Sequence, residues 1–248
     1  MSLEKLVAAL DECDRRGLKA DLWLRDDDAV EPTPALDTLL DLCGSFSAPV
    51  TLAVIPETTT EKLAQHLDSS DIAQVAVHGW SHVNYAGTKE KKQELGSHRE
   101  PDIVLDELQS GLDKLHDLHG GRLVPMLVPP WNRIDAGIVA GLAGLGYRAL
   151  SVFGPEKNTV PPPCLNTHVD VIDWHGSRGG REDDILFAET AARILKAAEN
   201  GGTTGILTHH LVHDDNVWRF LRRLFEATAG HAAARWRSSK DLVDEISP

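Results

Sequence analysis

Two histidines spaced four residues apart are the strongest candidates for chemistry in this sequence. His78 and His82 stand in "HGWSH", directly after an apolar run. On one helical turn or in a tight loop, imidazoles at this spacing face the same way. With one carboxylate they would form the two-nitrogen, one-oxygen set that suits a catalytic metal such as zinc, with a position left for water or substrate. Chance is the competing explanation, because the chain contains 12 histidines.

A run of three aspartates could supply the carboxylate. Asp26, Asp27 and Asp28 stand side by side in "DLWLRDDDAV", at the end of an apolar, strand-like run. Such a run is usually a helix cap or a solvated loop. Like charges so close together are unfavourable unless a cation or another positive group offsets them, so this run and the histidine pair together favour a metal site.

The pattern of apolar residues predicts which elements position these groups. Helices are expected at residues 3–15, 34–42 (with Thr33 as N-cap), 58–67, 101–118, 134–145, 184–198 and 214–227, and near the C-terminus. Strands are expected at residues 20–24, 49–55, 72–78, 122–128, 147–153, 166–172 and 203–209, with one more short strand after the last of these. This alternation predicts a parallel α/β architecture, either a barrel or an open sheet.

Polar residues follow these strands at the end where both architectures place their chemistry. The sets are "RDDDA", "HGWSH", "PPWNR", "DVIDW" and the pair His209 and His210. Each set alone is weak evidence. Together they predict acids and imidazoles along one edge of the fold.

Composition limits the classes of protein that remain. At 248 residues a single domain over residues 1–248 is expected. The net charge of −13 argues against nucleic acid as a partner. The N-terminal residues lack the pattern of a signal peptide and no apolar run could span a bilayer, so a cytoplasmic location is expected. The three cysteines are expected to be free, buried thiols. Both "GPEKNTVPPPC" and residues 84–101 are expected to be loops, the second covering the site.

The order of these polar sets resembles the five motifs of the NodB-homology polysaccharide deacetylases, also called carbohydrate esterase family 4. Those motifs read T-F-D-D-G, H-[ST]-x-x-H, R-x-P-[YF], D-x-x-D-W and L-x-H. The resemblance spans nearly the whole chain and implies a distorted (β/α)7 barrel. It also implies metal-dependent hydrolysis of an N-acetyl or O-acetyl group on a sugar or glycan precursor.

The resemblance also implies roles for individual residues. His78, His82 and an aspartate would bind a divalent metal, with zinc first and cobalt, nickel or manganese as alternatives. A neighbouring aspartate would be the general base, and His209 the general acid that protonates the leaving amine. The remaining matches are Asp173, as a catalytic residue, and Trp131, Trp174, Leu207 and Arg25, as substrate contacts.

The sequence departs from the family pattern at several positions. Three aspartates face a two-aspartate motif. If Ala29 takes the place of the motif's glycine, Asp27 is the base and Asp28 the ligand, and this register is preferred because alanine replaces glycine readily. In the other register Asp26 is the base and Asp27 the ligand. Val128 stands where the motif has arginine, which Arg25 or Arg133 could replace.

Further departures leave other functions open. Gly79 stands where the second motif has serine or threonine, and His210 competes with His209 for the role of acid. The substrate could instead be a small non-sugar amide, or the chain could be a catalytically silent homologue that binds metal or glycan. Fold alone does not separate these functions.

The two registers predict opposite results for single replacements. In the preferred register, replacing Asp28 abolishes metal binding, whereas replacing Asp27 spares metal binding and removes activity. Titration calorimetry with zinc on both variants measures this. Loss of metal binding on replacing Asp27, with a mild effect at Asp28, would establish the other register.

Overall fold

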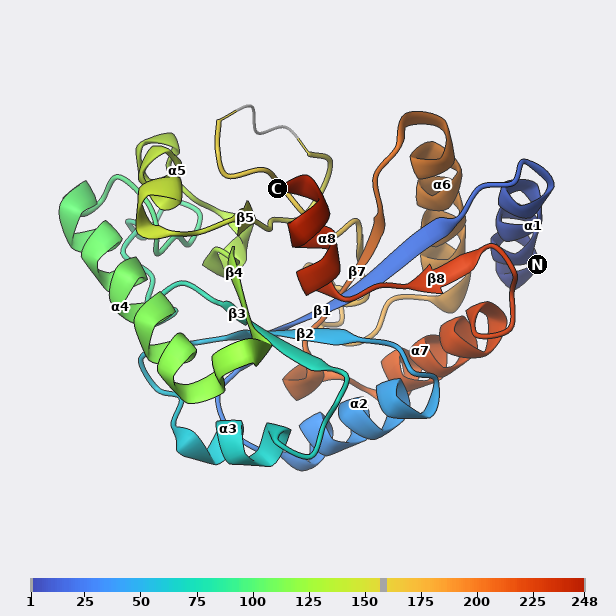
Figure 1. Cartoon of the computed structure of the whole chain (residues 1–248), viewed down its shortest axis with the longest axis horizontal. Helices are drawn as coiled ribbons and strands as arrows, with labels where there is room; N and C mark the ends of the chain where they lie inside the picture. Colours follow the sequence, from blue (N-terminus) through green and yellow to red (C-terminus); the bar gives the residue numbers. More distant parts are fainter. Residues whose placement is uncertain (1, 157–159, 248) are drawn as a thin grey trace. The chain divides into compact units, whose positions relative to one another are not determined.

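The computed structural model describes residues 2–156 and 160–247. Residues 157–159, in the predicted proline-rich loop, lie outside the described part of the chain. The strands are β1 (Ala20–Ala29), β2 (Val50–Val54), β3 (Ala73–Val77), β4 (Leu123–Leu127), β5 (Ala149–Leu150), β6 (Val169–Asp170), β7 (Thr204–Thr208) and β8 (Ala234–Trp236) (Figure 1). The strand pairings with a known register are all parallel, so the predicted parallel α/β class is confirmed.

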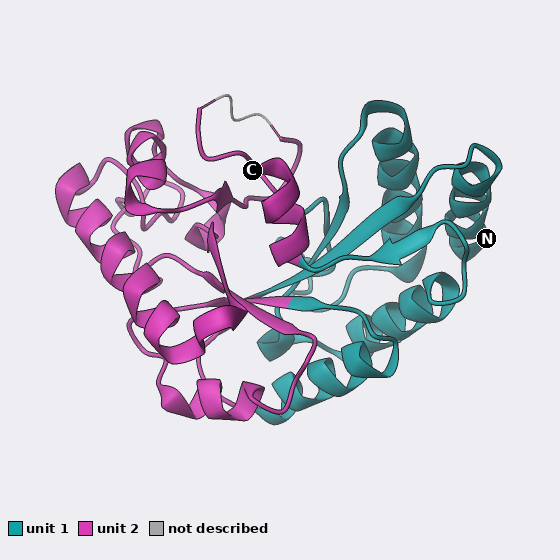
Figure 2. Ribbon diagram, viewed as in Figure 1, with its two compact units in different colours: residues 1–26, 33–50, 167–238 teal, residues 27–32, 51–166, 239–248 magenta. Residues whose placement is uncertain are grey.

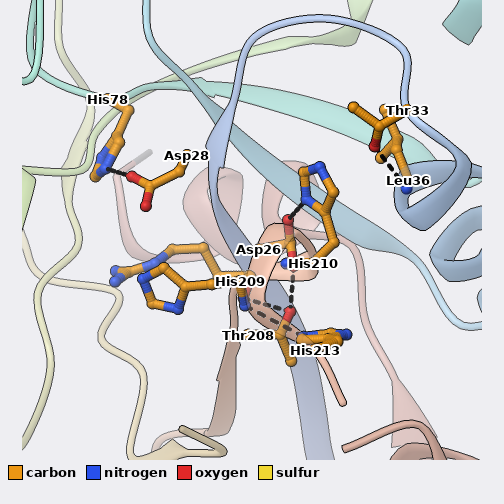
Figure 3. A network of polar contacts seen from close by, with 10 residues as sticks. Asp26, Asp28, Thr33, Leu36, His78, Thr208, His209, His210 and His213 are labelled. Atoms are coloured by element: carbon orange, nitrogen blue, oxygen red, sulfur yellow. Dashed lines mark hydrogen bonds and ion pairs between the residues drawn. The ribbon is translucent and has the colours of Figure 1, made fainter. Parts of the chain in front are cut away.

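The helices follow the predicted order closely. They are α1 (Ser2–Arg15), α2 (Pro34–Ser45), α3 (Glu61–Leu67), α4 (Pro101–His119), α5 (Ala136–Leu142), α6 (Asp183–Asn200), α7 (Asp215–Thr228) and α8 (Ser239–Ile246). The predicted N-cap of α2 is present, because the Thr33 hydroxyl accepts a hydrogen bond from the Leu36 amide at 3.0 Å (Figure 3).

The chain divides into two compact units, which Figure 2 shows in different colours. The first unit comprises residues 1–26, 33–50 and 167–238, and the second comprises residues 27–32, 51–166 and 239–248. Neither unit is a continuous stretch of sequence, since the boundary divides β1 between Asp26 and Asp27. The single-domain organisation stays a prediction.

In the first unit the strand order is β8-β1-β7-β6. The apolar part of β1 is buried on both faces, with Leu22, Trp23 and Leu24 almost inaccessible to solvent. Helix α1 packs against α6, and α6 also packs against α7, β6 and β7. A strand covered on both faces is typical of a parallel sheet, which explains why its apolar residues are nearly continuous.

In the second unit β3 pairs with β4, and β4 pairs with β5. Helix α4 packs against α3, α5, β3 and β4, and α8 packs against β4. Residues 51–54 of β2, which belong to this unit, are all buried, as expected for an apolar and β-branched strand in a parallel sheet.

Three strands differ in length from the prediction. Strand β1 runs on through the three aspartates to Ala29, so these residues belong to the strand instead of following it. Strand β5 is shorter than expected, because the Val152 amide donates to the Asn166 side chain at 3.0 Å. Strand β6 is also short, because the Ile172 amide donates to the Asp170 carboxylate at 2.9 Å.

The remaining structural expectations concern thiols and the membrane. All three cysteines are free, and Cys13 and Cys43 are buried as predicted, but the predicted burial of Cys164 is wrong because this residue is partly exposed. Among the described residues, no helix is both long and apolar enough to cross a membrane.

Buried His119, in the last turn of α4, makes the stability of the fold depend on pH. It is 7% exposed, and neither of its ring nitrogens has a hydrogen-bond partner. Burial, together with the charge of Arg122, lowers the pKa of His119 to about 4. The unfolded chain takes up this proton near pH 6.5. The free energy of unfolding therefore decreases as the pH falls from about 6.5 towards 4, by about 1 kcal/mol per pH unit.

A His119→Leu variant should lose this contribution. Its melting temperature should fall less between pH 7 and pH 5 than that of the parent, as measured by circular dichroism. His116→Leu is the matched control, because His116 lies exposed on the same helix. An equal fall in all three proteins would contradict the prediction.

Candidate functional site

The second unit brings together the three predicted metal ligands. Asp28 lies near the end of β1, His78 directly follows β3, and His82 lies in the loop beyond, which is not a helical turn. One ligand atom from each lies within 4.8 Å of the others. The Nε2 atoms of His78 and His82 approach the same Asp28 oxygen, at 3.0 Å and 3.3 Å (Figure 3 shows the first contact).

The protonation of His78 makes this convergence informative. Its Nδ1 atom lies 2.9 Å from the carbonyl oxygen of Val128, which can only accept, so Nδ1 carries the hydrogen. In a neutral ring, Nε2 then offers a lone pair to the Asp28 carboxylate, which is itself an acceptor. The contact is favourable only when a proton or a cation lies between the two atoms, and this tautomer is the one metal-binding histidines adopt.

The charges around His78 also favour a proton or a cation at this contact. Burial by itself would lower the pKa of His78, but the hydrogen bond to Asp28 and the negative charges of Asp27 and Asp28 raise it overall. The pKa of His82 is lowered instead, by burial and by neighbouring His78. Two imidazoles with such different proton affinities share one carboxylate, and the donor set fits a divalent cation of the zinc type.

The backbone around this cluster is in an uncommon conformation. Six described residues other than glycine have a positive φ, and four of them belong to this region: Asp28 (71°), His82 (58°), Trp131 (56°) and Asn132 (56°). Each such residue costs of order 1 kcal/mol and persists only where its surroundings hold it. The clustering of these four residues indicates that their surroundings hold the side chains of this region in place despite the backbone strain.

Trp131, which the sequence predicted to contact substrate, packs beside the proposed metal ligands. Its ring packs against His82 with centroids 4.4 Å apart, and the Lys92 ammonium lies 5.8 Å from its centroid. The next residue, Asn132, helps to line a cavity of about 610 Å³, whose other walls include Ile134, Val152 and Phe153. A largely apolar cavity thus begins beside residues 78–82, called the histidine loop below, and a substrate could bind there.

Glu94 is a residue of this region that sequence reasoning missed. Its side chain is almost completely buried, although it lies in the charged segment predicted to be a loop over the site. Burial raises the pKa of Glu94, and hydrogen bonds from Ser81 and Trp80 lower it, with a net rise. Its contacts with the histidine loop are described below.

Asp26, in the first unit, is fully occupied by structural contacts. One carboxylate oxygen accepts from the Thr208 hydroxyl at 2.7 Å and from the His210 amide at 2.8 Å, and the other contacts the His210 ring (Figure 3). Burial raises the pKa of Asp26, but the hydrogen bond from His210 and its charge outweigh burial and lower the pKa overall. These contacts do not favour the register in which Asp26 is the base.

His209 is placed differently from His210. It is partly exposed, and its ring meets Trp174 edge-on at 4.7 Å. Its Nδ1 atom is buried without a hydrogen-bond partner. The His209 amide lies 3.3 Å from the His213 Nε2 atom, and burial lowers the pKa of His213 to about 4, which keeps that ring neutral. Of the two adjacent histidines, only His209 is partly exposed, since His210 is buried.

Asp173 and Trp174 belong to one turn of the first unit. The Asp173 carboxylate accepts from the Gly176 and Ser177 amides at 3.0 Å and 3.1 Å. The Trp174 indole donates to Asp170 at 2.9 Å, and 41% of its surface is exposed. Asp173 thus stabilises its own loop, and its catalytic role stays a prediction.

The remaining predicted residues are less accessible. Arg25 and Leu207 are fully buried in β1 and β7, so neither presents surface to a substrate in this structure. Arg133 donates to the Lys92 carbonyl at 2.7 Å. Of the two candidates to replace the arginine missing at Val128, Arg25 is therefore inaccessible and Arg133 is engaged by a backbone carbonyl.

Comparison with known proteins identifies the fold. No protein-family model and no curated protein matches the sequence. Solved structures of polysaccharide deacetylases, however, match over nearly the whole chain, so the chain has the fold of carbohydrate esterase family 4.

Three of these structures illustrate the range of similarity to this chain. A Mycobacterium smegmatis protein assigned as a polysaccharide deacetylase has a TM-score of 0.69 and 15% identity, and the match covers 93% of this chain and 91% of that one. An acetyl xylan esterase from Clostridium thermocellum, in complex with cobalt, has a TM-score of 0.56 and 14% identity, covering 91% of each chain. A family 4 pseudoenzyme from Bacillus anthracis has a TM-score of 0.57 and 15% identity, covering 92% of this chain and 66% of that one.

The environments of the two adjacent histidines predict different effects of their removal. His210→Ala should lower the free energy of unfolding by about 3 kcal/mol, because it leaves the buried Asp26 carboxylate without its charged or donating partner. His209→Ala should change stability by less than about 1 kcal/mol. Urea unfolding followed by circular dichroism measures both, and a larger loss at His209 than at His210 would contradict these assignments.

Proposed function

We propose that this chain is a divergent member of carbohydrate esterase family 4 that removes an acetyl group from an acetylated sugar or glycan precursor. In addition to the fold, the proposal rests on one observation. The Nε2 atoms of His78 and His82 converge on one Asp28 oxygen, while Val128 fixes the tautomer that leaves the His78 nitrogen free to bind a cation. These three residues would hold a divalent metal.

Zinc is the metal that the donor set suits best, and cobalt, nickel and manganese are alternatives. When bound, such an ion polarises the acetyl carbonyl and lowers the pKa of the attacking water. The rest of the chemistry falls to the side chains of this chain.

Asp27 is the proposed general base. Its side chain is almost completely buried, and it directly precedes the proposed ligand Asp28 in the sequence. Its negative charge acts on the His78 ring. A carboxylate held close to the ligands can take the proton from the attacking water.

His209 is the proposed general acid, which delivers a proton to the leaving nitrogen because an amine anion is a poor leaving group. The edge-on contact with Trp174 holds its ring. Trp131 and Trp174 are the proposed substrate contacts. Leu207 could act only by closing the wall of an acetyl pocket, and buried Arg25 is the least favoured contact.

The substrate class follows less directly. An N-acetyl group on a sugar precursor inside the cell is the leading proposal, and a small non-sugar amide is the alternative that the apolar walls of the cavity support. A cytoplasmic location belongs to the same proposal.

One observation favours a catalytically silent homologue as a second candidate. Val128 replaces the arginine of the third motif, while Arg25 is buried and Arg133 donates to a backbone carbonyl. A family 4 pseudoenzyme is among the structures with this fold. Retention of both histidines, Asp27, Asp28 and His209 supports the enzyme.

Acetate release separates the two candidates. Protein loaded with zinc, cobalt, nickel or manganese is incubated with N-acetylhexosamines, their oligomers, O-acetylated sugars and small acetamides, and acetate is measured enzymatically. The proposal predicts release from at least one acetylated sugar. Metal removal should abolish it, and His209→Ala should slow it by at least about 100-fold.

The variant His78→Ala is the control for activity that does not depend on the proposed ligands. Stoichiometric metal binding without acetate release from any substrate would establish the silent homologue. Release from acetamides alone would establish the small-amide alternative.

A further inference from the structure

The loop that carries His82 depends on a single buried carboxylate. Glu94 is 1% exposed, and its oxygens accept hydrogen bonds from three consecutive backbone amides: Trp80 at 3.2 Å, Ser81 at 2.7 Å and His82 at 3.2 Å. The Ser81 hydroxyl donates to the same carboxylate at 3.1 Å. Consecutive amides that converge on one anion form a strong and geometrically specific contact.

Without Glu94, no helix or strand would provide a hydrogen-bond acceptor for these three amides. Residues 78–82 belong to neither a helix nor a strand, and both Gly79 and His82 have a positive φ, of 60° and 58°. An amide that loses its acceptor inside a partly buried loop favours another conformation of that loop. The positive φ of His82 adds to that tendency.

Gly79 and Glu94 form a matched pair. A Cβ atom at position 79 would lie 2.2 Å from a Glu94 carboxylate oxygen and 2.7 Å from Pro130. The carboxylate therefore occupies the space that any side chain at position 79 would need. This explains why glycine stands where the resembling motif has serine or threonine, a departure that the sequence left unexplained.

We infer that Glu94 is a positioning residue, which fixes the Trp80–His82 backbone so that His82 and His78 are presented together to a metal ion. It contacts the loop of one ligand and binds no substrate itself. The inference rests on the proposed metal site, but not on turnover.

Two variants in the same segment test this role. Glu94→Gln keeps the size of the side chain but replaces one acceptor oxygen by an amide group, which would face a backbone donor. Glu90→Gln is the matched control, because Glu90 is an exposed carboxylate four residues earlier whose contacts are with Gly87 and His98. Circular dichroism establishes that both variants fold.

Zinc affinity, measured by competition with a chromophoric chelator, is the main result. Glu94→Gln should weaken zinc binding by 10–100-fold, as expected for a residue that orients a ligand from outside the ligand set, whereas Glu90→Gln should stay within twofold of the parent. The cobalt-loaded protein should show a changed visible absorption spectrum only in Glu94→Gln. Zinc binding within twofold of the parent and an unchanged cobalt spectrum in Glu94→Gln would overturn the inference.

Amide hydrogen exchange of the metal-free proteins tests the loop itself. The Trp80, Ser81 and His82 amides should exchange at least tenfold faster in Glu94→Gln than in the parent and in Glu90→Gln. Unchanged exchange would also overturn the inference. Neither measurement needs a substrate, so a failure of acetate release in the parent would count against the proposed deacetylase alone.

Discussion

Three carboxylates stand side by side in strand β1, and like charges this close are tolerated only where other groups offset them. Asp26 is offset by the Thr208 hydroxyl and by His210, in the first unit. Asp28 faces two imidazole nitrogens in the second unit. Only Asp27 separates the two in sequence, so about 7 Å of backbone is the most that can lie between their Cα atoms.

This division of partners gives the aspartates different capacities. Asp26 uses both oxygens in hydrogen bonds and is therefore a structural residue. In a neutral His78 ring, Nε2 presents a lone pair to Asp28, and only a proton or a cation between the two atoms makes this contact favourable. Asp27 is almost completely buried and directly precedes Asp28 in the strand, and it is the proposed general base.

The histidine loop shows how a local departure from a motif can be compensated from elsewhere in the chain. Loss of a side chain at position 79 coincides with a buried carboxylate at position 94 that occupies the same space. A change at one of these positions therefore has consequences at the other. Metal affinity in such a loop depends on hydrogen bonds made outside the ligand set.

Much of this could be predicted from the sequence, because the alternation of strands and helices follows directly from apolar periodicity. The spacing of His78 and His82 and the small residue Ala29 also indicated a cluster of Asp28, His78 and His82, which lie close together in the structure. The length of β1 could not be predicted, since aspartate is rare in strands and only contacts such as that with Thr208 stabilise it there. Glu94 was missed because it lies in the charged segment "KEKKQELG", and burial of one charge among several depends on tertiary contacts.

The turn at His210 was also beyond sequence reasoning. The sequence indicated that His209 and His210 compete for one role, but not that the chain leaves the strand after Thr208 and buries His210 against Asp26. The local sequence pattern predicts whether a segment is a helix or a strand. Contacts with residues that are distant in sequence determine where the element ends.

The central claim is that Asp28, His78 and His82 bind one divalent ion. Anomalous diffraction at the zinc edge from crystals of the zinc-loaded protein tests it most directly. The account predicts a single strong anomalous peak bonded to the Nε2 atoms of both histidines and to a carboxylate oxygen of Asp28. A peak bonded to other residues, or none in protein that binds zinc stoichiometrically in solution, would contradict it.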